Sequence, residues 1–252
     1  MQFTTSDGVD LFFEVTGESP DLVLLNDMMM TTASWSLVVQ DLSAKHGCLL
    51  HDFRGQLRSP ARGPWNVEQH ADDLVELFDH LKIEQAHIAG VSYGGEVGMI
   101  FAYTYPERVR SLTVIAATSV ADDRMKVRAS AAMNAALTEP ERLVDVVASD
   151  FSPGTIDAER ARINTYPKEF FTGYNALCDA FTALDIADNL SAIRCPTLVI
   201  AAERDVVTPV ECSERIASAI PAARLHVIEN AGHAVVIEKP EEVSRAILDF
   251  VG

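Results

Sequence analysis

The sequence predicts an α/β fold: a mostly parallel central sheet with helices on both faces and a helical cap inserted into it. Six short apolar runs are typical of buried strands, and helical patterns lie between most of them: residues 22–25, 48–50, 87–91, 112–116, 198–201 and 225–228. This alternation indicates a parallel sheet covered by helices. Residues 119–193 show helical patterns and no buried strand, and they are too many for a loop. We therefore expect a core domain of residues 1–118 and 194–252 with a cap of residues 119–193.

Local signals support the individual elements. Turn residues 6–8 separate two β-prone runs, residues 3–5 and 11–15, which predicts an antiparallel hairpin. Asn66 is an N-cap for a helix over Val67–Leu81, and Pro240 suits the first turn of a final helix that ends near residue 251. In the insertion, residues 127–137, 141–151 and 170–184 are amphipathic and predict the helices of the cap.

Composition excludes several classes of function. Among 252 residues, 20 Lys+Arg stand against 37 Asp+Glu, a formal net charge of −17, which disfavours nucleic acid and anionic membranes as partners. The four cysteines lack C-x-x-C spacing, so we expect reduced core thiols and neither a zinc site nor a disulfide framework. We see no signal peptide and no apolar run of about 20 residues, and we expect a cytoplasmic protein that acts on a small molecule.

A nucleophile motif stands at the end of the third predicted strand. Gly90-Val91-Ser92-Tyr93-Gly94 is a G-x-S-x-G between an apolar strand and a helical run. In such a sharp turn the glycines allow close backbone approach, and the serine hydroxyl projects over the sheet. The motif predicts Ser92 as a catalytic nucleophile.

A serine nucleophile needs a histidine base and an acid that orients it. His233 lies in a glycine-containing loop after the last strand, whereas the other six histidines fall on or beside predicted helices and strands. Asp205 follows the preceding strand, and Glu203, nearer the strand end, is its rival. The chain order Ser92, Asp205, His233 matches one triad-bearing fold and differs from the chymotrypsin and subtilisin orders.

With these motifs in order, the chain resembles an α/β-hydrolase over essentially its whole length. It is most similar to the group that contains 3-oxoadipate enol-lactonases and small carboxylesterases. The resemblance implies oxyanion-hole donors on the backbone of Met28 and Tyr93, because the loop after the first central strand supplies one N–H in this family. Asn26 and Asp27 stand where the family often has His-Gly, and their side chains can hold the loop backbone.

The loop of residues 51–59 departs from the family as well. Gln56 and Leu57 replace the His-Gly of D-x-R-G-H-G-x-S, which makes the substrate class less defined without affecting the triad.

We expect an apolar and aromatic substrate pocket formed by Asn26, Met29, Met30, Phe170, Phe171 and Tyr174. The cap cations Arg124, Lys126, Arg128, Arg160 and Arg162 have acidic neighbours in sequence and are expected on a solvated face. A neutral substrate is therefore predicted in preference to an anionic one.

The predicted function is hydrolysis of a carboxylic ester or lactone through an acyl-enzyme, with no metal or organic cofactor implied. Carbon–carbon bond hydrolysis, or a cofactor-free lyase reaction, is an alternative on the same fold. A triad-bearing small-molecule receptor is another, and a purely structural or regulatory protein is the least favoured. A serine nucleophile disfavours haloalkane dehalogenase chemistry.

Overall fold

The computed structural model describes residues 1–17, 19–61, 63–148 and 154–252. Its centre is an eight-stranded sheet of order β1-β2-β4-β3-β5-β6-β7-β8. Strands β3 to β8 are parallel, and the β1-β2 hairpin joins the sheet antiparallel to β4. The strands are β1 (Gln2–Thr4), β2 (Asp10–Thr16), β3 (Pro20–Leu25), β4 (Gly47–His51), β5 (Ala86–Val91), β6 (Val109–Ile115), β7 (Thr197–Ala202) and β8 (Arg224–Ile228). The mostly parallel sheet and its hairpin are thus confirmed.

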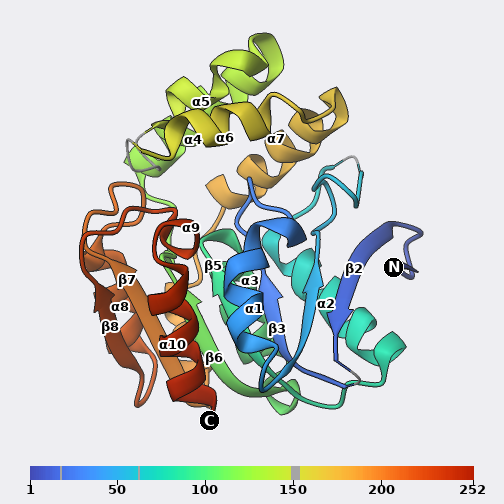
Figure 1. Ribbon diagram of the computed structural model, residues 1–252, viewed down its shortest axis with the longest axis vertical. Helices are drawn as coiled ribbons and strands as arrows, with labels where there is room; N and C mark the ends of the chain where they lie inside the picture. The colour runs from blue at the N-terminus through green and yellow to red at the C-terminus, as the bar shows by residue number, and fades with distance from the viewer. Residues whose placement is uncertain (18, 62, 149–153) are drawn as a thin grey trace.

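Helices cover both faces of this sheet (Figure 1). The core-domain helices are α1 (Ser36–Leu42), α2 (Val67–Leu81), α3 (Tyr93–Thr104), α8 (Val210–Ala219), α9 (Val235–Glu238) and α10 (Pro240–Val251). Successive strand side chains point to opposite faces, so Val23 of β3 packs in the cluster with α2, α3 and α8, whereas Leu24 packs in the cluster with α1 and α10. Asn66 caps α2 as expected, because its Oδ1 accepts the N–H of Gln69 at 3.0 Å.

One strand differs from the expectation of full burial. In β8 only Ile228 is buried, and Leu225 and Val227 are 39% and 38% exposed. β8 pairs with β7 alone and so forms an edge of the sheet. An apolar run does not show whether its strand will be central or at an edge, which explains the error.

The described residues between β6 and β7 contain four α-helices that lie over one end of the sheet (Figure 1). They are α4 (Asp123–Thr138), α5 (Leu143–Val146), α6 (Ile156–Ile163) and α7 (Lys168–Thr182). The predicted segment of residues 141–151 lies partly outside the described residues. Where this helical segment leaves and rejoins the core, Ala121 N–H donates to Leu184 O at 3.0 Å and Ile186 N–H donates to Ser119 O at 2.9 Å. The cap boundaries at residues 119 and 193 remain a prediction.

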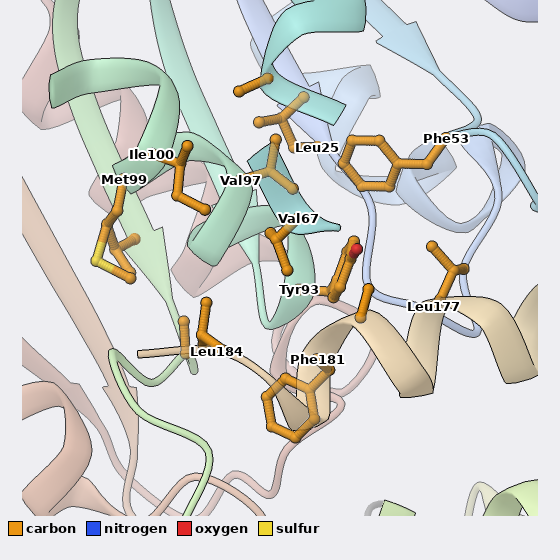
Figure 2. Close-up of a cluster of buried hydrophobic side chains, with 14 of the residues drawn as sticks. Leu25, Phe53, Val67, Tyr93, Val97, Met99, Ile100, Leu177, Phe181 and Leu184 are labelled. Atoms are coloured by element: carbon orange, nitrogen blue, oxygen red, sulfur yellow. The ribbon is translucent and has the colours of Figure 1, made fainter. Parts of the chain in front are cut away.

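The last cap helix, α7, packs against the start of α3, the helix that follows Ser92. Figure 2 shows Leu177 and Phe181 of α7 facing Tyr93 at the start of α3, with Val67 beside them. All four side chains belong to one buried cluster. The cap is therefore fixed over the carboxyl ends of β3 and β5, where the candidate site lies.

Candidate active site

Ser92 occupies a strained turn between β5 and α3, with φ 52° and ψ −120°. A Cβ at Gly90 would lie 2.1 Å from Gly94 O, and a Cβ at Gly94 would lie 2.3 Å from Leu25 O. Both positions therefore require glycine, because no side chain fits there. The Ser92 N–H donates to Ile115 O at 2.8 Å, which fixes the turn to β6. The backbone thus holds the Ser92 hydroxyl at the carboxyl ends of the parallel strands.

Three side chains distant in sequence form a hydrogen-bonded chain at these strand ends. His233 Nε2 lies 3.0 Å from Ser92 Oγ, and His233 Nδ1 lies 2.8 Å from Asp205 Oδ2. Ser92 follows β5, Asp205 follows β7 and His233 follows β8. Because these strands are parallel, their carboxyl ends lie at the same end of the sheet and place the three groups together. A carboxylate only accepts, so Nδ1 carries the proton and Nε2 can accept the serine proton. The structure brings together the three residues that the sequence proposed.

The carboxylate of Asp205 is firmly held. Its Oδ1 accepts the N–H groups of Val207 and Thr208 at 2.8 and 2.9 Å, and its Oδ2 accepts the Thr208 hydroxyl at 2.9 Å. Burial raises the pKa of Asp205, but the charge of His233 and the hydrogen bonds from His233 and Thr208 outweigh burial, and the pKa is lowered. Burial likewise lowers the pKa of His233, yet the neighbouring charge of Asp205 dominates and raises it above its usual value.

Glu203, the rival acid, lies elsewhere. Its Oε2 accepts the N–H of Asn230 at 2.8 Å and so ties the β7 loop to the loop that carries His233. Asp205, not Glu203, contacts the imidazole.

The prediction that Asn26 lines the substrate pocket is wrong. Asn26 is fully buried beneath the site and does not line the cavity described below. Its amide donates to His51 O, Asp52 Oδ1 and Gln56 Oε1 at 3.0 to 3.2 Å, and its Oδ1 accepts the Trp35 indole N–H at 2.9 Å. All hydrogen-bonding atoms of its side chain are engaged within the protein. It joins the loop after β3 to the loop after β4.

Gln56 orients the peptide between Asp27 and Met28. Its Nε2 donates to Asp27 O at 2.7 Å, while its Oε1 accepts the N–H of Phe53 at 2.9 Å. In a trans peptide the C=O and N–H point in opposite directions, so binding Asp27 O turns the Met28 N–H away from Gln56. Tyr93 is the first residue of α3, so its N–H has no acceptor within the helix. These are the two amides that the resemblance suggested as oxyanion donors.

A cavity of about 90 Å³ lies between the carboxyl ends of the parallel strands and the cap. Ser92, His233, Met28, Met29, Met30 and Tyr174 line it, with apolar groups that include Met125, Ala129, Ala132, Val147, Phe181 and Val236. The prediction that Phe170 and Phe171 line the pocket is wrong. Their side chains are only 2% and 7% exposed, they belong to the buried core cluster, and they do not line the cavity. Three aromatic residues of α7 were predicted to line the pocket, and of these only Tyr174 lines the cavity.

The cavity also contains ionisable residues that the sequence analysis does not place there. Arg128 and Arg162 line it, contrary to the expectation of a solvated face, together with Asp27 and Glu96. The Arg162 guanidinium donates to Met29 O at 3.1 Å and to Glu159. Asp27 Oδ2 lies 4.0 Å from His233 Nε2. The acidic Asp27, two residues after the apolar strand β3, was the signal available in the sequence.

No group of three or more His, Cys, Asp and Glu side chains suited to a metal ion occurs among the described residues. Nor does the described part of the chain include a helix both long and apolar enough to span a membrane.

The chain is similar to known proteins over most of its length. The model of the alpha/beta hydrolase family matches residues 22–246. The chain is 29% identical to a putative carbamate hydrolase RutD of Caulobacter sp. (strain K31), covering 100% of this chain and 98% of the relative. It is 28% identical to 3-oxoadipate enol-lactonase 2 of Acinetobacter baylyi, covering 96% and 93%. A thermophilic esterase structure from Thermogutta terrifontis matches with a TM-score of 0.87 at 26% identity, covering 100% and 97%. The chain belongs to the alpha/beta hydrolase family.

Proposed function

We propose that this chain is a serine hydrolase that cleaves a carboxylic ester or lactone of a small molecule through an acyl-enzyme. The observation that carries the proposal is the hydrogen-bonded chain Ser92–His233–Asp205, which faces a cavity from a strained turn. An esterase and an enol-lactonase among its relatives support the same reaction class.

In this mechanism His233 Nε2 takes the Ser92 proton as Oγ attacks the substrate carbonyl. The Met28 and Tyr93 amides stabilise the oxyanion of the tetrahedral intermediate. His233 then protonates the leaving alkoxide, and Asp205 stabilises the imidazolium in between. A water molecule deprotonated by His233 next attacks the acyl-enzyme, and the acid leaves as Ser92 regains its proton.

A fluorophosphonate probe tests the nucleophile directly, because an activated serine attacks phosphorus as it attacks a carbonyl. Intact-mass and peptide mass spectrometry should find one adduct, on Ser92, and none in the Ser92→Ala variant. An adduct on another residue, or no adduct, would contradict the proposal.

Carbamate hydrolysis is the second candidate, and Asp27 favours it. The leaving nitrogen of a carbamate receives its proton from His233 Nε2, and Asp27 Oδ2 is 4.0 Å from that atom. An acceptor there can bind the N–H of the leaving group and orient the nitrogen. Several relatives are named putative carbamate hydrolases, which supports this choice.

Matched substrates distinguish the two candidates. We would compare kcat/KM for an ester and a carbamate of identical size in the wild type and in Asp27→Gly. If carbamates are the substrates, the variant should lose about tenfold more activity on the carbamate than on the ester, the effect of one hydrogen bond to a charged group. Equal losses would leave the ester or lactone assignment in place.

The raised pKa of His233 predicts how activity depends on pH. The base must be neutral, so kcat/KM should fall as pH decreases through the folded-state pKa, with a midpoint above the usual value near 6.5. The negative charge of Asp27 contributes to the shift, and Asp27→Asn should move the midpoint to lower pH. The exposed Asp188→Asn is the matched control and should leave it unchanged. A midpoint below 6.5 in the wild type would contradict this expectation.

Gln56 is predicted to position the oxyanion hole. Gln56→Leu removes the hydrogen bond to Asp27 O and frees the Met28 peptide to rotate. Loss of an oxyanion donor lowers kcat by about 10²- to 10³-fold, so a misaligned donor should lower it about 10- to 100-fold with little change in KM. The exposed Gln40→Leu serves as control. Thermal unfolding separates this effect from misfolding, and an unchanged kcat in a folded variant would exclude the role.

A further inference from the structure

Glu96 is a buried carboxyl group that the triad mechanism does not use. It lies in the first turn of α3 and is only 1% exposed. It lines the same cavity as Ser92 and His233. Its Oε2 is buried and has no hydrogen-bond partner in the described part of the chain. A buried oxygen without a partner is rare in native structures, so this atom requires an explanation.

The helix directs this carboxyl group toward the nucleophile. Glu96 N–H donates to Ser92 O at 3.1 Å, so Glu96 stands one helical turn after Ser92. Side chains on a helix lean toward its N-terminus, which brings the Glu96 carboxyl back over the turn that carries the serine. A molecule in the cavity would therefore meet Ser92 and Glu96 together.

The pKa of Glu96 lies above 7, so the protonated form of its carboxyl group predominates at pH 7. Burial raises its pKa to about 8, with a hydrogen bond from the Thr118 backbone acting in the opposite direction. The charge of Asp27 raises the pKa further, and that of His233 lowers it. A protonated carboxyl group carries an O–H donor, which an ionised one lacks. The other titratable residues lining the cavity are Asp27, Arg128, Arg162, Tyr174, Cys178 and His233.

We propose that Glu96 is a substrate-binding residue whose protonated carboxyl group donates a hydrogen bond from Oε2 to a second oxygen of the substrate, apart from the reacting carbonyl. The substrate class is then an ester or lactone that bears an additional uncharged acceptor, such as an ether, keto or hydroxyl oxygen. This inference rests on the proposed hydrolase function and narrows its substrate. Sites that hydrogen-bond a substrate discriminate strongly against analogues that lack the group, because a buried partner is then left unpaired.

Matched substrates in which one methylene is replaced by oxygen test this role. On the acyl side, p-nitrophenyl pentanoate is compared with the 3-methoxypropanoate and the ethoxyacetate. On the alcohol side, butyl acetate is compared with 2-methoxyethyl acetate. For each pair the measured quantity is the ratio of kcat/KM, ether over alkyl, in the wild type, Glu96→Leu and Glu96→Gln. Intrinsic reactivity differences cancel when these ratios are compared between variants. The exposed Glu107→Leu is the matched control.

We expect Glu96→Leu to lower the ratio about tenfold for the pair whose oxygen meets Oε2, and Glu107→Leu to leave it unchanged. Glu96→Gln keeps a neutral donor, so it should retain most of the discrimination. As pH rises from about 7 to about 9, the wild-type ratio should fall toward that of Glu96→Leu, because Glu96 ionises, while the Glu96→Gln ratio stays constant.

Fluorophosphonate labelling separates this inference from the function on which it rests. If Ser92 is labelled in every variant but the ratios are the same in wild type and Glu96→Leu for all pairs, the role of Glu96 is excluded and the hydrolase assignment stands. If Ser92 is not labelled in the wild type, the proposed function fails and this inference fails with it. Should Glu96→Leu not fold, the pH dependence of wild type against Glu96→Gln decides the question alone.

Discussion

Ser92→Ala is expected to lower kcat by about 10⁶-fold on the best substrate of an ester and lactone panel, the loss typical of removing a nucleophile from a complete triad. Alanine adopts the backbone of the turn no worse than serine, and it removes only the atom that His233 Nε2 contacts at 3.0 Å. The fold and the cavity should be retained. The residual activity should reflect substrate binding and the oxyanion donors.

Ser213→Ala is the matched control, because Ser213 is a fully buried serine whose Oγ has no partner in the described chain. It should leave kcat unchanged. The panel includes β-diketones beside p-nitrophenyl esters, so that carbon–carbon bond cleavage would be detected as well. Ligand binding without turnover in the wild type would favour a receptor instead. Ser92→Ala activity close to wild type would require a different nucleophile.

Local signals explain why most of the fold could be predicted. Asn66 and Pro240 mark helix starts by hydrogen bonding and ring geometry that involve only neighbouring residues. The turn at Ser92 needs Gly90 and Gly94 because a Cβ at either position would collide with neighbouring backbone atoms. The two glycines of the motif therefore indicate this geometry from sequence alone. Such signals do not depend on the rest of the structure.

Contacts between distant segments explain what could not be predicted. Asn26 and Gln56 each depart from the family pattern, and the two side chains meet at 3.0 Å although 30 residues separate them. A single sequence does not reveal that pairing, so the sequence predicts Asn26 in the pocket, whereas the structure buries it beneath the pocket. The exposure of β8 is a further case, since it depends on strand order and not on the strand's own residues.

The cap shows the same limitation for individual side chains. Its helices were expected, but which face of each helix meets the cavity depends on how the cap is seated. Arg162 has an acidic neighbour, Glu159, as the sequence suggested, yet it also contacts Met29 O in the loop beside Ser92. Glu96 carried a weaker signal, an acid in the otherwise apolar first turn of α3. An ionisable residue in an apolar turn indicates a site only once a cavity is known.

Asp205→Asn is expected to lower kcat by about 10⁴-fold with the fold intact. The asparagine Oδ1 can still accept the N–H groups of Val207 and Thr208, which now donate to Asp205 at 2.8 and 2.9 Å, so the loop after β7 keeps its conformation. The amide nitrogen then faces His233 Nδ1 as a donor. The imidazole must accept there and carry its proton on Nε2, where it can no longer take the proton of Ser92.

Glu203→Gln is the matched control for this prediction. Its amide oxygen can still accept the Asn230 N–H, now bound at 2.8 Å, so we expect less than about a twofold change in kcat. The measurements are kcat on the best panel substrate and the thermal unfolding midpoint of each variant. If Glu203→Gln loses more activity than Asp205→Asn while both remain folded, the orienting role belongs to Glu203. If both variants retain wild-type kcat, neither carboxylate orients His233, and the proposed mechanism fails at that step.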